Sequence, residues 1–328
     1  MERIAAFGIG STNFRYAIGV TTGDFLTDIT VESTRPHELV DQIVGAVEDL
    51  RGATSGRLDG IAVTSPGRVD TETGVVRDLD TPEGGLIDRI DLGSEVEAAT
   101  NLPVYVENDC NASALGEWYY GVSADYESVA HVTFGTGIGG GVVERGRLVR
   151  GEADEAGEFG LLPVALESGL ESSGVTGAWE ACCSGRGIPE YVTHLLEDGS
   201  VELDPAESRL DPDEEFTAQD VFEAANTGDE VAQECLDRIH RYNAAGIAAI
   251  CNAFNPGLVT VGGGVALNNQ AEVVGEIETR LDEYLFVDRP DIRPTRIGDD
   301  IGLYGALATS LDAAGAETMS RQEPMFHS

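Results

Sequence analysis

Apolar and polar positions alternate along this chain in short blocks, each typical of one strand or one helix. The blocks that read as strands are four to seven apolar residues long and end at glycine or polar turns. A hairpin with a glycine-rich turn is predicted at 129–145. Single strands are predicted at 4–7, 14–20, 60–63, 101–106 and 258–261.

The helical blocks follow the 3.6-residue period. In the first of them, at 37–50, Leu39, Ile43 and Val47 fall on one face. Strands and helices therefore alternate, which favours an α/β architecture. Further helices are predicted at 111–120, 175–182, 187–197, 217–227, 229–253 and 302–314.

The length of 328 residues predicts two lobes. We place an N-terminal α/β lobe at 1–114, completed by a C-terminal helix within 300–318, and a C-terminal α/β lobe at 115–299. The acidic stretch 196–215 is expected to be a solvated loop, and the residues after Thr318 a loose tail.

Charge separates this chain from most globular proteins. It carries 59 acidic residues against 20 basic ones, a formal net charge of −39, and every basic residue is an arginine. Molar salt shortens the Debye length to about 3 Å and would screen this repulsion, so the composition indicates a halophilic protein that unfolds on desalting. An acidic interaction tail is the alternative, but the charge is spread along the chain. Nucleic-acid binding is not expected, because no basic patch is visible.

No segment has the apolar length of a membrane span, and the first strand begins almost at Met1 without a signal-peptide pattern. We therefore expect a cytoplasmic protein. The five cysteines are an odd number without the spacing of a secreted framework, which indicates reduced thiols.

The run Gly135-Thr136-Gly137-Ile138-Gly139-Gly140-Gly141 joins the two strands of the predicted hairpin. Glycines let backbone amides approach one anion closely, and Thr136 adds a hydroxyl donor. No lysine follows, so this is not the Walker pattern. A flexible hairpin turn is the alternative, but it needs fewer glycines, and we favour a phosphate-binding turn.

Two other glycine turns follow strands. Gly8-Ile9-Gly10-Ser11-Thr12-Asn13 offers two hydroxyl donors and suggests a second phosphate loop. Gly262-Gly263-Gly264 is a place where an adenosine could lie against bare backbone. An ordinary tight turn is the alternative in both cases.

Asp109 stands between a predicted strand and a predicted helix, directly after Glu107 and Asn108. It is either the N-cap of that helix or a general base that accepts the proton of a substrate hydroxyl. Three polar residues at one strand end exceed what a cap requires, which favours the base.

Two further segments carry side chains of interest. Glu158 stands between glycines in 156–160 and is either a ligand of vicinal sugar hydroxyls or an exposed loop acid. Cys182 and Cys183 are adjacent and have no second cysteine pair, so buried thiols at a helix end are favoured over a zinc site.

Together these segments resemble the ROK family of sugar kinases and repressors, within the actin-like ATPase superfamily. The resemblance runs from Gly8 to Ala306, and its most specific segments are 65–67, 107–112, 135–141 and 156–160. It implies a two-lobed, ribonuclease H-like fold with a central cleft, and the use of ATP and Mg²⁺. It also implies a homodimer, by family habit.

The resemblance assigns a role to each motif. Asp109 would be the catalytic base. The implied sugar-binding residues are Ser65, Gly67, Asn108, Glu158 and Glu190. The implied nucleotide-binding residues are Gly10, Ser11, Thr12, Gly135, Thr136 and Gly137 at the phosphates, and Gly262, Gly263 and Gly264 near the adenosine.

The chain also departs from the family pattern. Gly8 stands where an Asp associated with magnesium is usual, and Asn13 where a Lys often ends that loop. Leu161 replaces a histidine that touches sugar and helps to bind zinc, and Cys183 alone remains of three zinc cysteines, so no structural zinc is expected. The usual Pro-Asn sugar ligand has no clear match near 81–83.

Three functions remain open on the sequence. An ATP-dependent kinase of a hexose or related sugar is the leading hypothesis. A non-catalytic sugar or nucleotide sensor is the second, motivated by Gly8 and Leu161. A kinase of a sugar acid or another alcohol is the third. The acceptor sugar and the hydroxyl phosphorylated cannot be read from the sequence.

Overall fold

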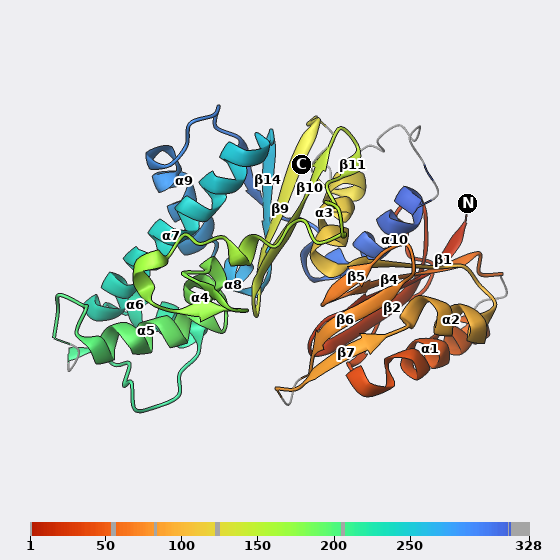
Figure 1. Cartoon of the computed structure of the whole chain (residues 1–328), viewed down its shortest axis with the longest axis horizontal. Coiled ribbons are helices and arrows are strands. Elements are labelled where there is room, and N and C mark those ends of the chain that lie inside the picture. Colours follow the sequence, from red (N-terminus) through yellow and green to blue (C-terminus); the bar gives the residue numbers. More distant parts are fainter. Residues whose placement is uncertain are drawn as a thin grey trace. The chain divides into compact units, whose positions relative to one another are not determined.

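The computed structural model describes residues 2–53, 57–81, 84–121, 125–204, 207–313 and 315. The chain forms two compact units (Figure 1). Unit 1 contains the described residues of 1–129, 141–157 and 296–328, and unit 2 those of 130–140 and 158–295. The predicted boundary at residue 114 falls inside a helix, and the structure keeps that whole helix in unit 1.

Unit 1 is built on a five-stranded sheet with strand order β3-β2-β1-β4-β8. β1 pairs antiparallel with β2 and parallel with β4, and β4 pairs parallel with β8. The predicted strands at 4–7, 14–20 and 60–63 are confirmed. The strands are β1 (Arg3–Ile9), β2 (Asn13–Val20), β3 (Thr30–Ser33), β4 (Gly60–Ser65) and β8 (Val104–Asn108).

Helices cover both faces of this sheet, which explains the continuous apolar run of β1. Phe7 belongs to the apolar core that also contains Ile43 and Val47 of α1, whereas Gly8 faces the backbone at Gly302 in α10. The predicted helices at 37–50, 111–120 and 302–314 are confirmed within a few residues. The helices of unit 1 are α1 (Leu39–Ala53), α2 (Leu92–Thr100), α3 (Asp109–Tyr120) and α10 (Ile301–Ala313).

Several small elements of unit 1 were not predicted, β3 and α2 among them. A three-stranded antiparallel sheet follows β4, and its strands are β5 (Arg68–Asp70), β6 (Val75–Asp80) and β7 (Leu86–Ile90). The predicted strand at 101–106 begins three residues later, because Asn101 ends α2 in a left-handed conformation with φ 57°. Pro82 and Glu83 lie outside the described residues, as do residues 316–328.

Glycines bring α3 and α10 into close contact. A Cβ at Gly305 would lie 2.6 Å from the carbonyl oxygen of Ala112, and one at Gly116 would lie 3.0 Å from the amide of Gly305. The two backbones therefore pack directly on each other. This contact holds α3, whose first residue is Asp109, against the sheet of unit 1.

The second five-stranded sheet has the order β11-β10-β9-β14-β15. The predicted hairpin at 129–145 is confirmed as β9 and β10, and its two strands carry the chain between the units. β14 pairs parallel with β15. The strands are β9 (Ser128–Phe134), β10 (Ile138–Glu144), β11 (Arg147–Leu148), β14 (Leu258–Gly262) and β15 (Asp291–Pro294).

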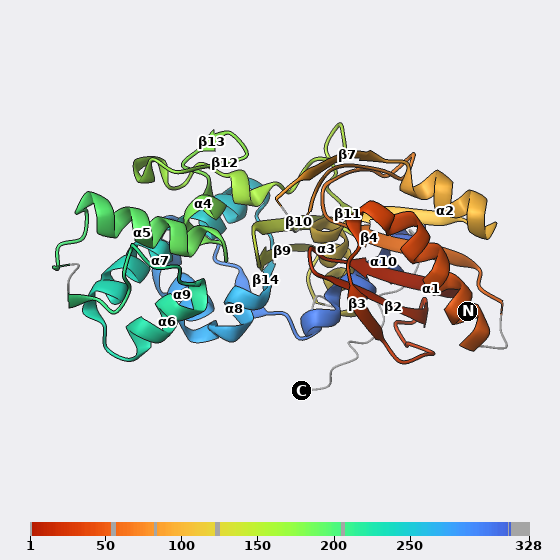
Figure 2. The same ribbon diagram turned by 90° about the horizontal axis from the view of Figure 1, so that it is seen from below.

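Helices of unit 2 pack around the long helix α7, as Figure 2 shows from below. Trp179 of α4 is fully buried, donates to Asn243 of α7 at 2.9 Å, and lies over Gly246. The predicted helices at 187–197, 217–227 and 229–253 are confirmed. The helices are α4 (Trp179–Cys183), α5 (Gly187–Asp198), α6 (Ala218–Asn226), α7 (Glu230–Phe254), α8 (Gly264–Asn268) and α9 (Glu276–Arg280).

The helix predicted at 175–182 is wrong in its first half. Val175–Thr176 is strand β13, paired with β12 (Glu171–Ser172) in a small hairpin. Gly174 and Gly177 have φ of 78° and 70°, a conformation that interrupts a right-handed helix. The acidic stretch 196–215 is largely non-helical, but Val201 and Leu210 are buried and fix it to unit 2.

Candidate functional site

In unit 1, Asp109 is the first residue of α3, directly after β8. The N-cap is Asn108, whose Oδ1 accepts from the amides of Cys110 at 2.9 Å and Asn111 at 3.1 Å. The alternative interpretation of Asp109 as the N-cap is therefore wrong, because its neighbour has that role. The Asp109 carboxylate also accepts from the amide of Cys110, at 2.9 Å.

The surroundings of Asp109 suit a proton acceptor. Its side chain is partly buried, and this burial raises the pKa of the carboxyl, while the hydrogen bonds from Cys110 oppose the rise. A base with a pKa nearer to neutrality accepts a proton more readily from a hydroxyl. Asp109 thus has both the position and the electrostatics of a general base.

Two other predicted site residues lie beside it in unit 1. Gly67 has φ 88°, and its carbonyl accepts from Nδ2 of Asn108 at 3.1 Å. Ser65 pairs with Asn108 in the β4–β8 register. Ser65 is fully buried, and its hydroxyl donates to the carbonyl of Pro66 at 2.9 Å. The structure therefore gathers Ser65, Gly67, Asn108 and Asp109 at one edge of the sheet.

The turn between β1 and β2 presents hydroxyls to solvent. Its backbone is closed by the amide of Gly10, which donates to the carbonyl of Asn13 at 2.8 Å. Thr34 donates its hydroxyl to the carbonyl of Gly10 at 2.8 Å. Ser11 and Thr12 are exposed. This arrangement holds the turn in shape while leaving two hydroxyl donors at its tip.

The neighbourhood of Gly8 fits magnesium poorly. A Cβ at Gly8 would lie 3.4 Å from the backbone of Gly302, and its register partner Arg15 binds Asp300 at 3.2 Å and Asp299 at 3.7 Å. Within the described ranges no three His, Cys, Asp or Glu side chains gather as metal ligands. The carboxylates available here thus already neutralise an arginine.

In unit 2, Gly135, Thr136, Gly137 and Ile138 form a turn that we call the glycine turn. The amide of Gly135 donates to the carbonyl of Gly137 at 2.9 Å. The carbonyls of Gly135 and Thr136 accept from the amides of Gly185, at 2.8 Å, and Arg186, at 3.2 Å. Within the part of the chain that the structure describes, no backbone acceptor is found for the amides of Thr136 and Gly137.

Glu180 fixes the other side of the glycine turn. Its Oε2 accepts from the amide of Ile138 at 3.0 Å, and its Oε1 accepts from the hydroxyl of Ser172 at 2.6 Å. A Cβ at Gly137 would lie 2.8 Å from the same carboxylate, and one at Gly160 would lie 2.7 Å from it. Sequence reasoning missed Glu180, because no motif marks it.

The third glycine run adjoins the glycine turn. Gly263 has φ 86°, and a Cβ there would lie 2.3 Å from the carbonyl oxygen of Phe134, the last residue of β9. A Cβ at Gly262 would lie 3.0 Å from the ring of His131. Gly264 begins α8, with no atom nearer than 4.0 Å to a built Cβ. Unit 2 therefore brings together two of the three predicted nucleotide-binding runs.

The two predicted sugar-binding carboxylates of unit 2 are exposed. Glu158 directly precedes Phe159. The ring of Phe159 packs against Gly140, where a Cβ would lie 2.5 Å from the ring. Glu190 lies in the first turn of α5. Exposed carboxylates can accept hydrogen bonds from vicinal hydroxyls, and the rigid packing of Phe159 holds the first of them in place.

The cysteine segment does not fit a zinc ion. Cys182 and Cys183 are buried at the end of α4, as the favoured interpretation predicted. Burial raises the pKa of the Cys182 thiol to about 11, and the Cys183 thiol lies 3.8 Å from the carbonyl of Ile239. A tetrahedral zinc site needs four ligands, and within the described residues no three His, Cys, Asp or Glu side chains gather that could supply them.

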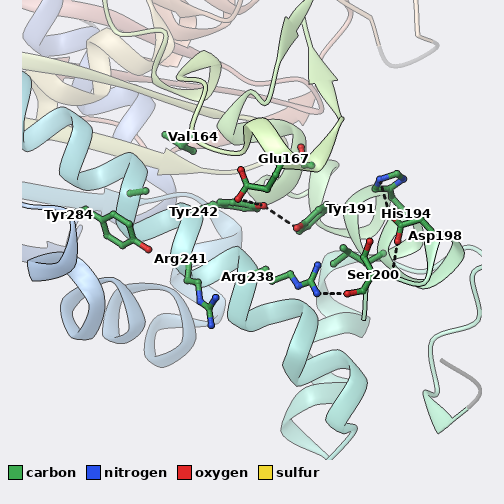
Figure 3. A pocket seen from close by; sticks show the side chains of 13 residues that line it. Val164, Glu167, Tyr191, His194, Asp198, Ser200, Arg238, Arg241, Tyr242 and Tyr284 are labelled. Atoms are coloured by element: carbon green, nitrogen blue, oxygen red, sulfur yellow. Dashed lines mark hydrogen bonds and ion pairs between the residues drawn. The ribbon is translucent and has the colours of Figure 1, made fainter. Parts of the chain in front are cut away.

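Unit 2 also contains a cavity of about 520 Å³ along α5 and α7 (Figure 3). The hydroxyls of Tyr191 and Tyr242 meet there at 3.2 Å, and Tyr242 donates to Glu167 at 3.2 Å. Arg238 bonds the carbonyl of Ser200. None of the predicted site residues lines this cavity.

The features gathered in the two units are those of a phosphotransferase: backbone turns with free amides or hydroxyls, and a partly buried carboxylate at a strand end. The family model described as "ROK family" matches residues 4–313. The chain therefore belongs to the ROK family.

Relatives of known structure or name agree with this assignment. A glucokinase of Halalkalibacterium halodurans is 30% identical over 309 residues, covering 90% of this chain and 91% of that protein. The ROK hexokinase from Thermus thermophilus superposes with a TM-score of 0.80 at 27% identity, covering 96% and 100% of the two chains. A ROK glucokinase from Streptomyces griseus, solved with glucose and AMPPNP, gives 0.73 at 28% identity, covering 94% and 98%.

No helix among the described residues is both long and apolar enough to cross a membrane.

Proposed function

We propose that this ROK-family sugar kinase transfers the γ-phosphoryl group of ATP to a hydroxyl of glucose or a closely related hexose. The observation that carries the proposal is Asp109, a partly buried carboxylate with a raised pKa at the start of α3. The similarity to glucokinases at 30% identity and to a kinase solved with glucose and AMPPNP supports the choice of substrates.

The reaction assigns Asp109 one proton transfer. Its carboxylate accepts the proton of the attacking sugar hydroxyl, the hydroxyl oxygen forms a bond to the γ-phosphorus, and the bond to the bridging oxygen of ADP breaks. The proton then leaves Asp109 for water. A raised pKa favours the first transfer, and the amide of Cys110 keeps the carboxylate oriented.

The remaining assignments concern binding. Asn108, Glu158 and Glu190 would bind sugar hydroxyls, with Ser65 and Gly67 shaping the backbone around Asn108. Gly10, Ser11 and Thr12 would bind phosphate through their turn, as would Gly135, Thr136 and Gly137, and Gly262 to Gly264 would lie near the adenosine. Such contacts orient the reactants, which accelerates the transfer without new chemistry.

Magnesium would accompany ATP, neutralising charge on its phosphates. Since the residues around Gly8 fit the metal poorly, we propose that phosphate oxygens and water supply most of its ligands. We further propose an actin-like architecture, a homodimer, a cytoplasmic location and a halophilic origin, the last because of the net charge of −39.

An ADP-release assay in molar KCl with magnesium tests the proposal. The panel contains glucose, other hexoses, hexosamines, pentoses and sugar acids. We expect ADP release with glucose or a close relative. A folded sample that binds glucose by calorimetry but releases no ADP with any of these compounds would instead support the sensor, and turnover of sugar acids alone would support the third hypothesis.

A further inference from the structure

One buried charge network in unit 1 lies directly behind the catalytic strand end. Glu107, the residue before Asn108, is 1% exposed, and its Oε2 binds the guanidinium of Arg150 at 2.8 Å. The same Arg150 nitrogen binds Asp312 of α10 at 2.8 Å. Arg150 therefore joins β8 to α10 through two carboxylates.

Backbone hydrogen bonds connect this charge network to Asp109. Glu107 Oε1 accepts from the amide of Asn108 at 3.0 Å, and Asn108 caps the helix whose first residue is Asp109. Each link is a hydrogen bond of ordinary length between groups with little freedom to move. The position of the Asp109 carboxylate thus depends on where Glu107 is held.

Glu107 needs its cation to stay there. Burial raises the pKa of the Glu107 carboxyl, and the charge of Arg150 opposes the rise. A buried carboxylate that loses its paired cation either takes up a proton or moves toward water. Either change disturbs the hydrogen bond to Asn108.

Arg150 is also the first residue of the segment 150–157. Two further contacts join this segment to the rest of unit 1. The Asp154 carboxylate accepts from the amide and the hydroxyl of Thr71, at 3.0 and 2.8 Å, and Glu155 pairs with Arg68. The segment therefore stays attached if the Thr71 contact alone is removed, which provides a control.

We propose that Arg150 is a positioning residue of the phosphoryl transfer, holding Glu107 and through it Asn108 and Asp109. The inference rests on the proposed kinase function. It assigns Arg150 no contact with sugar or ATP. Its loss should therefore lower kcat and leave the two KM values nearly unchanged.

The test compares four variants in steady-state ADP release at molar KCl, with melting temperatures recorded for each. Arg150→Met should lower kcat by about 10- to 100-fold, since displacements near 1 Å can cost about 100-fold, while both KM values change less than about threefold. The double variant Glu107→Gln/Arg150→Met should recover at least about fivefold of this loss, because the fully buried charge of Glu107 is removed together with its cation and the amide oxygen of Gln can still accept from Asn108. A role in stability alone would lower the melting temperature of Arg150→Met and leave its kcat unchanged.

Two variants serve as controls. Arg145→Met removes an arginine of the same unit that is 77% exposed, and Thr71→Val removes the hydroxyl that donates to Asp154 while the backbone amide still can. Both should keep kcat within about twofold of wild type, since neither touches Glu107.

The outcomes separate the two proposals. Suppose that the wild type is active and Arg150→Met is folded. If kcat of Arg150→Met is then unchanged, or if only its KM values change, the positioning role is overturned and the proposed function stands. A double variant no better than Arg150→Met, or a Thr71→Val as impaired as Arg150→Met, also overturns the positioning role. If Arg150→Met does not fold, the double variant takes its place in the test. A double variant that is folded and active with a reduced kcat supports the inference, and one with the kcat of the wild type overturns it. A wild type inactive on every sugar overturns the proposed function, and the positioning role with it.

Discussion

The contact between Glu180 and the glycine turn gives a quantitative prediction for ATP use. Glu180→Ala removes the acceptor of the Ile138 amide at 3.0 Å and of the Ser172 hydroxyl at 2.6 Å. It also leaves a space beside Gly137 and Gly160, where the carboxylate now occupies the room that a Cβ would need. The turn should then sample conformations in which the amides of Thr136 and Gly137 no longer point at one anion.

The magnitude follows from the bonds lost. A hydrogen bond to a charged group contributes about 1.5–3 kcal/mol, and water replaces part of it because Glu180 is partly exposed. A net loss of about 1.4–2.8 kcal/mol corresponds to a fall of about 10- to 100-fold in kcat/KM for ATP. The value of kcat/KM for the sugar should fall less, because Glu158 precedes Phe159, whose ring packs against Gly140.

The assay is ADP release at varied ATP and saturating sugar, in molar KCl. Glu180→Gln should recover most of the activity, since its amide oxygen can accept from Ile138 while its NH₂ group donates to Ser172. Glu171→Ala is the matched control, because Glu171 is exposed on β12 beside Ser172. A folded Glu180→Ala with unchanged kcat/KM for ATP would refute the reasoning, and a Glu180→Gln as weak as Glu180→Ala would show that the charge matters instead of the hydrogen bond.

Three further predictions concern stability. Gly263→Ala should lower the free energy of unfolding by at least about 3 kcal/mol in urea titrations, because φ is 86° and the new Cβ would lie 2.3 Å from a carbonyl oxygen. Gly264→Ala is the control and should lower it by less than about 1 kcal/mol, because the space around Gly264 is open. Burial lowers the pKa of His131 from 6.5 to about 4, so between these values only the unfolded chain binds the proton. Stability should therefore decrease by about 1.4 kcal/mol for each unit by which the pH is lowered in this range, and His131→Gln should remove this slope from denaturant titrations. Dialysis from molar KCl into dilute buffer should unfold the protein, as followed by circular dichroism, because 59 acidic residues then repel without screening; a fold unchanged at low salt contradicts the halophilic assignment.

The sequence predicted those parts of the fold whose signals are local. The strand at 4–7 and the helix at 229–253 have apolar patterns long enough to be unambiguous, and the structure places both within a few residues. The helix predicted at 175–182 shows where this reasoning ends. Its apolar positions suit a helix, but Gly174 and Gly177 adopt positive φ values that only the folded hairpin requires.

Site residues divide in the same way. Asp109 was found because its neighbours are polar and follow a strand, and Gly263 because glycine runs are rare. Glu180 and Arg150 were missed, since each acts through partners 42 and 43 residues away in sequence and neither lies in a motif. Spacing alone cannot show that a surface-like acid accepts from a turn amide. Nor did it show that Asn108, instead of Asp109, caps α3.

The central claim is that Asp109 accepts the proton of the sugar hydroxyl. It is tested most directly by ADP release and sugar phosphate formation with Asp109→Asn, measured against wild type in molar KCl with glucose and ATP. Asparagine keeps the size of the side chain and can still accept from the amide of Cys110, so the fold and both KM values should be retained. We predict a fall in kcat of about 100- to 10,000-fold, the usual contribution of a general base. A folded Asp109→Asn that phosphorylates glucose at the wild-type rate would contradict the account.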